Sequence, residues 1–180
     1  MRVIGGEFRS RRLKSIPGLA TRPTTDRLRE TLFDILGAQV QGTVFLDAYA
    51  GTGAVGIEAL SRGAARAVFI EKSKNAAKVL RENLASLGLG GRALVVVAGT
   101  LSSLAEQKAD IVFLDPPYER EGEYAQALRL LSENQPRLVV VQHSVRFALA
   151  EAYDALKRTR ILRQGDNALS FYAVEIVRDR

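Results

Sequence analysis

The chain has 180 residues, of which 47% are hydrophobic and 26% charged, and it contains no cysteine. This size and composition predict one globular domain with an adequate core and a small appendage. Disulfides, thiolate chemistry and cysteine-based metal sites are excluded, and a lone histidine, His143, excludes a histidine-rich metal site. Because neither a membrane-length apolar run nor a signal sequence is visible, we expect a cytoplasmic protein without a metal or membrane partner.

The net charge of +6 is concentrated at the start of the chain. Between residues 1 and 30, eight Lys and Arg stand against three Asp and Glu, so this segment alone carries +5. Such an asymmetry indicates a polyanionic partner, most simply a nucleic acid. The alternative is a solvated basic segment that binds nothing.

The chain opens with a short basic hairpin. A strand at Arg2–Ile4 is broken by Gly5-Gly6, and residues 9–13 can return alongside it. We therefore expect a basic β-hairpin extension over residues 1–20 and a single domain over residues 21–180. That domain begins with a helix that Thr25 or Asp26 caps and that ends near Gly37.

Strands and helices then alternate along the chain. The expected strands are 44–47, 67–71, 93–97, 111–114, 137–141, 160–162 and 169–177. The expected helices are 54–62, 73–87, 124–133 and 147–156. This alternation predicts an α/β fold with a doubly wound, mostly parallel, seven-stranded Rossmann-like sheet. The last two strands, joined by a turn at residues 165–167, are expected to form an antiparallel hairpin at the sheet edge.

The first strand leads into a glycine-rich loop. Residues 51–56 fit the pattern G-x-G-x-x-G, and Glu71 follows 20 residues after Gly51, where an acid can bind ribose hydroxyls. This pairing indicates a nucleoside-containing cofactor; the alternative is tight packing of strand against helix. Asp47, just before the loop, would repel a pyrophosphate but can pair with an ammonium, which favours S-adenosylmethionine. Asp47 could instead only accept loop N–H groups.

The fourth strand ends at Asp115-Pro116-Pro117-Tyr118. Its apolar run, residues 111–114, is typical of a central parallel strand, and proline cannot continue it. Asp115 is therefore expected at the carboxyl end of the sheet, where open α/β folds bind ligands. The alternative is a turn without chemistry.

Together these motifs resemble those of S-adenosylmethionine-dependent amino-methyltransferases. The N-terminal block, from residues 2–6 through 12–13 to 21–30, is similar to the RsmD-type enzymes, which methylate the N2 amino group of one guanine in bacterial 16S ribosomal RNA. The resemblance covers most of the chain. The Asp-Pro-Pro-Tyr tetrapeptide is shared with enzymes that act on adenine, so it indicates only the class.

The resemblance implies a set of site residues. The catalytic ones are Asp115, Pro116, Pro117 and Tyr118. The cofactor-binding ones are Asp47, Tyr49, Ala50, Gly51, Thr52, Gly53, Glu71, Lys72, Thr100 and Asp115. The charge of the N-terminal segment adds RNA-binding candidates at Arg9, Arg11, Arg12 and Lys14, and the resemblance adds Arg22. Many relatives place an adenine-binding acid after the third strand; here Thr100, or a backbone carbonyl, is expected to substitute for it.

Three further expectations concern the partners of the protein, the role of His143 and the alternative functions. The substrate would be 16S rRNA within the small subunit or an assembly intermediate, and the protein a monomer. His143 is expected to be a structural hydrogen-bonding residue, not a base. The alternatives are an adenine-N6 methyltransferase of DNA or RNA, a nucleotide-dependent dehydrogenase and a non-catalytic RNA-binding protein.

Overall fold

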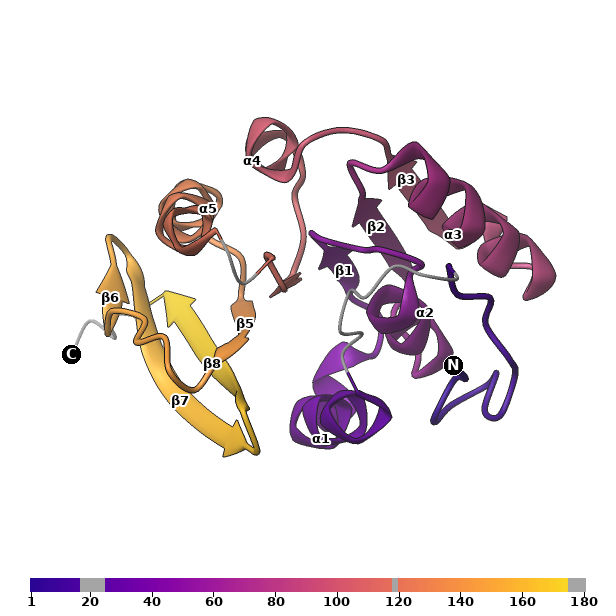
Figure 1. Ribbon diagram of the computed structural model, residues 1–180, viewed down its shortest axis with the longest axis horizontal. Helices are drawn as coiled ribbons and strands as arrows, with labels where there is room; N and C mark the ends of the chain where they lie inside the picture. The colour runs from indigo at the N-terminus through magenta and orange to yellow at the C-terminus, as the bar shows by residue number, and fades with distance from the viewer. Residues whose placement is uncertain (17–24, 118–119, 175–180) are drawn as a thin grey trace.

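The computed structural model describes residues 1–16, 25–117 and 120–174. Its centre is one mixed sheet in the order β3-β2-β1-β4-β5-β8-β7-β6 (Figure 1). The strands are β1 Val44–Asp47, β2 Arg66–Ile70, β3 Ala93–Val96, β4 Ile111–Leu114, β5 Leu138–Ser144, β6 Ala152–Tyr153, β7 Leu156–Gln164 and β8 Asn167–Val174. The first five are parallel to one another, and β8 pairs antiparallel with both β5 and β7.

Within the part of the chain that the structure describes, the sheet has eight strands where seven were expected. The predicted antiparallel hairpin is β7 and β8, and the additional two-residue strand β6 pairs with β7. The α/β class, the parallel strands and their antiparallel end agree with the sequence pattern. The first strand of the hairpin is longer than predicted, since β7 spans Leu156–Gln164 where residues 160–162 were expected. It also contains a register shift between Arg158 and Arg160.

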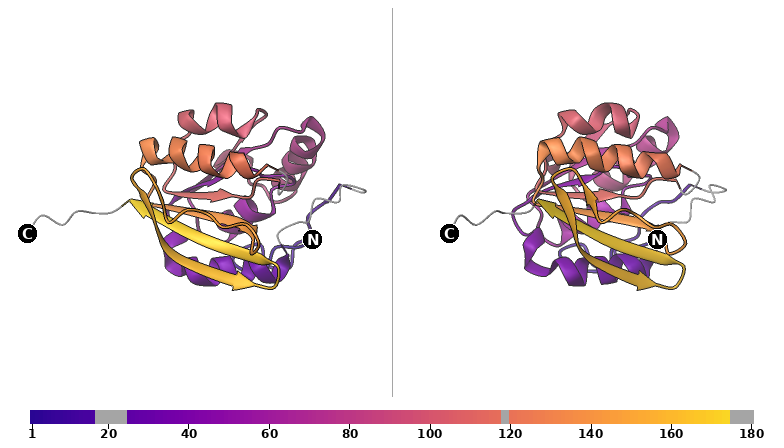
Figure 2. Two further views of the ribbon diagram at one scale, coloured as in Figure 1. Left: turned by 60° about the vertical axis from the view of Figure 1, so that its left-hand side comes forward. Right: turned by 90° about the vertical axis from the view of Figure 1, so that its left-hand side faces the viewer.

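Helices cover both faces of the sheet (Figure 2). They are α1 Asp26–Leu36, α2 Ala54–Ser61, α3 Lys74–Ser86, α4 Thr100–Ser103 and α5 Glu121–Asn134, with 3-10 turns at Gly37–Val40, Gly90–Arg92 and Leu104–Glu106. Alternate strand residues point to opposite faces. Phe45, Phe69 and Phe113 pack with α1, α2 and α3 in one buried cluster. Leu46, Val112 and their neighbours pack with α5 in a second cluster.

Local sequence accounts for how several helices begin. The hydroxyl of Thr25 accepts the Leu28 N–H at the start of α1, and Ser73 caps α3 by accepting from Ala76. These are the caps expected from the sequence, and each typically stabilises its helix by about 1 kcal/mol. Within the described residues, none of the helices is long and apolar enough to cross a membrane.

One predicted helix is wrong. Residues 147–156 form turns, the short strand β6 and the first residue of β7. Side chains from elsewhere satisfy this backbone: Tyr172 donates its hydroxyl to the Ala150 carbonyl at 2.7 Å, and Arg158 donates to the Leu149 carbonyl at 3.0 Å. Because these tertiary contacts replace helical hydrogen bonds, the weak helical pattern does not decide the conformation.

The N-terminal arm, residues 1–16, turns back on itself. A single antiparallel bridge between Arg2 and Arg12 joins its two sides, so its strand pairing is less extensive than in the expected β-hairpin. Val3 and Leu13 are buried in the same cluster as α1, α2 and α3. The arm is thus packed on the domain and shares its core. The proposed boundary at residue 20 lies outside the described residues.

Candidate active site

Three predicted acids meet at the carboxyl ends of neighbouring parallel strands. Asp47 ends β1, Glu71 follows β2 and Asp115 follows β4. Because β1 pairs with both β2 and β4, these strand ends lie side by side. The loop after β1 is hydrogen-bonded to both neighbours, since Ala48 N–H donates to the Phe113 carbonyl and Ala50 N–H to the Ile70 carbonyl, each at 3.0 Å.

The glycines of the loop have different roles. Gly53 has φ 90°, and a Cβ there would lie 2.2 Å from Leu80. At Gly56 a Cβ would lie 2.2 Å from the Phe69 ring, so these two glycines permit close packing of α2. Gly51 has φ 55° and open space beside it. Packing therefore explains Gly53 and Gly56, whereas Gly51 leaves room for a ligand to approach the backbone.

Glu71 bridges the glycine loop and the start of α3. One carboxylate oxygen accepts the Gly51 N–H and the other the Ser73 N–H, both at 2.7 Å. Each oxygen retains a second lone pair, which suits it to accept ribose hydroxyls. The neighbouring Lys72 is exposed, and the side chain of Thr52 is partly exposed.

Asp47 is 2% exposed and accepts the Gly56 N–H at 2.9 Å. Asp47 thus accepts a backbone N–H at the end of the glycine-rich segment, which is the structural role considered in the sequence analysis as the alternative to an ammonium contact. Burial raises the pKa of Asp47 to about 7; the Gly56 hydrogen bond opposes this rise and the charge of Glu71 adds to it. A nearby cation would favour the ionised form of this acid.

Tyr49 joins the cofactor side of the site to α5. Its hydroxyl donates to Glu123 at 2.9 Å, and Glu123 also pairs with Arg120 at 2.7 Å. Burial and the neighbouring Glu123 raise the pKa of Tyr49. Thr100 donates its hydroxyl hydrogen to the Ala48 carbonyl at 2.7 Å. That hydrogen is committed to the fold, so an adenine contact by Thr100 would use its remaining lone pairs or its backbone.

The predicted catalytic loop follows β4 directly. Asp115 is partly exposed, Pro116 is buried and Pro117 is exposed. The Pro116 carbonyl accepts a long hydrogen bond of 3.4 Å from the hydroxyl of Tyr124 in α5. Tyr118 lies outside the described residues, so its place beside Asp115 stays a prediction.

His143 is a structural residue, as expected. It is 2% exposed. Its Nδ1 lies 2.9 Å from the Ser144 carbonyl and 3.0 Å from that of Phe147, and its Nε2 lies 2.8 Å from the Ser170 hydroxyl. Desolvation by burial lowers its pKa, which favours the neutral ring.

Two basic residues of the arm, Arg11 and Lys14, contact α3. Arg9, Arg11, Arg12 and Lys14 are all exposed. Arg11 donates to the Ser86 carbonyl at 3.1 Å, and Lys14 pairs with Glu82 at 2.8 Å. Among the described residues, Arg9 and Arg12 have no salt bridge. Arg22 lies outside the described residues.

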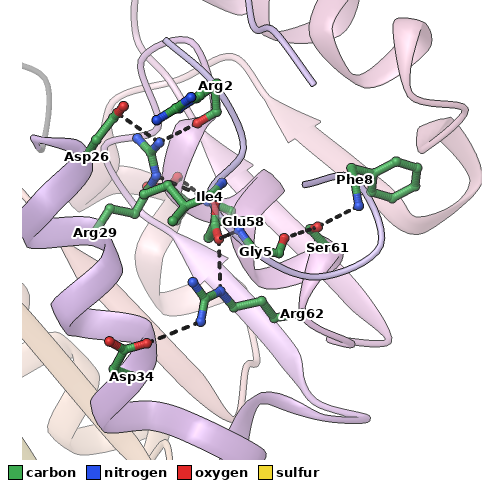
Figure 3. A network of polar contacts seen from close by, with 12 residues as sticks. Arg2, Ile4, Gly5, Phe8, Asp26, Arg29, Asp34, Glu58, Ser61 and Arg62 are labelled. Atoms are coloured by element: carbon green, nitrogen blue, oxygen red, sulfur yellow. Dashed lines mark hydrogen bonds and ion pairs between the residues drawn. The ribbon is translucent and has the colours of Figure 1, made fainter. Parts of the chain in front are cut away.

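A buried ionic network, which the sequence did not reveal, fixes the arm (Figure 3). Glu58 of α2 is fully buried and accepts the N–H groups of Ile4 and Gly5, each at 2.8 Å. Fully buried Arg29 of α1 lies 3.7 Å from Glu58 and donates to the Arg2 carbonyl at 2.6 Å. In the sequence, Arg29 contributes only to the net charge of residues 1–30, and its place on the apolar side of α1, beside Leu32 and Phe33, is the signal that could have indicated burial.

The described residues contain no cluster of histidine and acidic side chains able to hold a metal ion. A parallel sheet with an open glycine loop, an acid after β2 and a carboxylate after β4 has the architecture of the α/β methyltransferases. The chain belongs to the family described as Conserved hypothetical protein 95, which it matches over residues 1–173.

Comparisons with individual proteins agree with this membership. Ribosomal RNA small subunit methyltransferase D of Escherichia coli (strain K12) is 43% identical over 136 residues, covering 74% of this chain and 68% of that protein. The structure of Escherichia coli yhhF has a TM-score of 0.85 and 38% identity, covering 97% of this chain and 98% of that one. The resemblance noted in the sequence is thereby confirmed.

A more distant structure shares the fold alone. The RNA methyltransferase from Salinibacter ruber, in complex with S-adenosyl-L-homocysteine, has a TM-score of 0.66 and 20% identity. The match covers 87% of this chain and 97% of the Salinibacter ruber chain.

Proposed function

We propose that this protein is an S-adenosylmethionine-dependent methyltransferase that modifies the N2 amino group of a guanine in 16S rRNA. The observation that carries the proposal is the position of Asp115 directly after β4, beside strand β1 and the open glycine loop that follows it. The similarity to ribosomal RNA small subunit methyltransferase D supports the substrate class.

The residues of the loop fit such a cofactor. Gly51 presents its backbone with no atom within 4 Å of where a Cβ would lie. Glu71 would bind the ribose hydroxyls through its free lone pairs, and Asp47 would offset the charge of the amino-acid ammonium. The bound cofactor would supply a methyl group already activated by its sulfonium. The protein's own task is therefore alignment and electrostatic stabilisation.

Asp115 and Pro116 would prepare the amine. An exocyclic base amine is a poor nucleophile because its lone pair is delocalised into the ring. If its two N–H groups donate to the Asp115 carboxylate and the Pro116 carbonyl, the nitrogen becomes pyramidal and its lone pair is localised. The Tyr124 hydroxyl, 3.4 Å from the same carbonyl, would keep that acceptor in place. Tyr118 would stack on the base, which must be unpaired or flipped out.

The basic arm would hold the RNA backbone. Arg9 and Arg12 are exposed and without a salt bridge among the described residues, so phosphates can pair with them without displacing an internal acid. Arg11 and Lys14 already contact α3, so each would share its charge between α3 and the RNA. Because this arm is short, we infer recognition of a preformed surface of the small subunit or of an assembly intermediate.

Methyl transfer from labelled S-adenosylmethionine tests this function. The protein is incubated separately with naked 16S rRNA and with small-subunit particles isolated from cells that lack it. We expect label in RNA from the particles, at no more than one methyl group per RNA. Absence of label from both substrates would overturn the proposal.

A further inference from the structure

Asn83 of α3 connects the basic arm to the cofactor loop. Its side chain is 1% exposed. Its amide oxygen accepts a hydrogen bond from the backbone N–H of Lys14 at 2.8 Å. Its amide nitrogen donates to the Lys14 carbonyl at 3.1 Å and to the Thr52 carbonyl at 3.0 Å. One buried side chain therefore holds two segments that are 38 residues apart in sequence, from Lys14 to Thr52.

The geometry of the amide makes these contacts interdependent. Both N–H groups and one lone pair of Asn83 are used, and burial keeps water from replacing a lost partner. A buried amide that loses a partner retains its full cost of desolvation. Withdrawal of the arm would remove two of the three hydrogen bonds that hold the Asn83 amide, so the side chain that positions the Thr52 carbonyl would be less restrained.

The same face of α3 also sets the shape of the loop. Leu80, three residues before Asn83, lies where a side chain at Gly53 would have to be. Thr52 lies between Gly51, whose N–H is held by Glu71, and Gly53. Movement at Thr52 would thus shift the neighbouring backbone at Gly51, which is the part of the loop that is open to the cofactor.

The arm docks next to Asn83 through charged side chains. Arg11 donates to the carbonyl of Ser86, and Lys14 pairs with Glu82. Both contacts are exposed, so RNA phosphates can reach these two cations. Ordering of the arm by a polyanion would tighten the Lys14 backbone against Asn83 without touching Asn83 itself.

We propose that Asn83 is a positioning residue that couples RNA binding by the arm to cofactor binding by the glycine loop. The inference rests on the proposed function, because it takes the arm's ligand to be 16S rRNA and the loop's to be S-adenosylmethionine. Thermodynamic linkage then requires each ligand to raise the affinity for the other by the same factor. We expect a factor of about five, at the low end of measured couplings.

The experiment measures this factor directly. The dissociation constant for 16S rRNA is determined with and without saturating S-adenosylhomocysteine, and that for S-adenosylhomocysteine with and without the RNA. The variant Asn83→Asp is isosteric and keeps the acceptor for the backbone N–H of Lys14, but its ionised carboxylate cannot donate to the carbonyls of Lys14 and Thr52. Its coupling factor should fall to about one, since a ratio cancels any uniform loss of folded protein.

Lys14→Gln is the matched control. It removes the charge but keeps the backbone N–H and carbonyl that Asn83 binds. RNA binding should weaken in this variant while the coupling factor stays near the wild-type value. A structural role alone would lower the melting temperature of Asn83→Asp and leave its coupling factor unchanged.

A second measurement needs no variant. Amide hydrogen exchange of residues 50–53 in the wild-type protein should slow when RNA is added. Coupling near one in the wild type, or an unchanged factor in Asn83→Asp, overturns the inference while leaving the proposed function intact. Failure of the wild type to bind 16S rRNA at all would instead overturn the proposed function, and this inference with it.

Discussion

Glu71 accepts the backbone N–H of Gly51, 20 residues earlier in the chain, at 2.7 Å. This bond joins the end of β2 to the loop after β1, and the other oxygen of the same carboxylate holds the first residues of α3 through Ser73. The acid is therefore placed at the loop before any ligand arrives, which lowers the cost of ordering on binding.

Replacing Glu71 by Gln should weaken S-adenosylhomocysteine binding. The amide retains one acceptor oxygen, so it cannot hold Gly51, Ser73 and a ribose at the same time. Loss of a charged hydrogen bond costs about 1.5–3 kcal/mol, which is a loss of about 10- to 150-fold in affinity by calorimetry. Glu133→Gln, on the exposed face of α5, is the control and should bind like the wild type. Equal affinity in the two variants would contradict the role of Glu71.

Gly51→Ala and Gly53→Ala should separate cofactor binding from stability. Alanine at position 51 meets only the strain of φ 55°, about 1–2 kcal/mol, yet its methyl group occupies the space beside the loop. Alanine at position 53 adds a collision with Leu80 to φ 90°, so thermal unfolding should show a loss of about 2–5 kcal/mol.

Gly91→Ala is the control for both substitutions, because it has open space and no positive φ. It should change neither stability nor affinity. If Gly51→Ala binds S-adenosylhomocysteine as tightly as the wild type does, the space beside Gly51 is not part of the cofactor site.

Asp47 should make stability depend on pH. Its pKa in the folded state is about 7, above the ordinary value of 3.8, so between these pH values the folded chain holds a proton that the unfolded chain releases. Wild-type stability should therefore fall as pH rises through this window. Asp47→Asn, which can still accept from Gly56, should be more stable than the wild type at pH 8, by at most about 4 kcal/mol. Denaturant unfolding at pH 5 and pH 8 measures the difference, and an equal effect at both would contradict the raised pKa.

The same variant tests the proposed ammonium contact. A cationic ligand favours the ionised carboxylate, so wild-type affinity for S-adenosylhomocysteine should increase as pH rises from 6 to 8. In Asp47→Asn that increase should be lost, together with part of the affinity. A pH dependence that survives the substitution would assign it to another group.

The salt dependence of RNA binding tests the basic arm. Each lost phosphate contact should reduce the slope of log affinity against log salt by about 0.7–0.9. Arg9→Gln combined with Arg12→Gln should therefore reduce it by about 1.4–1.8, measured by filter binding between low and physiological salt. Lys157→Gln with Arg160→Gln, on β7, is the charge-matched control. A slope that is the same in the two double variants would reject a specific role for the arm.

Much of the fold follows from local sequence. The run at residues 111–114 is fully buried, as a central parallel strand requires, and Pro116 ends it. The caps at Thr25 and Ser73 are local hydrogen bonds within three residues, so the chain itself specifies them. The parallel orientation of β1 to β5 follows from their alternation with helices.

Long-range contacts account for the rest. Residues 147–156 lack a helix because Tyr172, 22 residues after Ala150, and Arg158, nine residues after Leu149, bind the backbone carbonyls of these two residues. The pairing of Glu58 with the arm joins residues 53 and 54 positions apart. In the site, a glycine pattern alone cannot distinguish Gly51, which has open space, from Gly53, which Leu80 covers.

The central claim is that Asp115 orients a guanine N2 amine for methylation. The most direct test identifies the labelled nucleoside after transfer to small-subunit particles by the wild type and by Asp115→Ala. We predict N2-methylguanosine from the wild type, and transfer reduced more than about 100-fold in Asp115→Ala with the affinity for S-adenosylhomocysteine largely retained. N6-methyladenosine as the product, or wild-type turnover in Asp115→Ala, would contradict it.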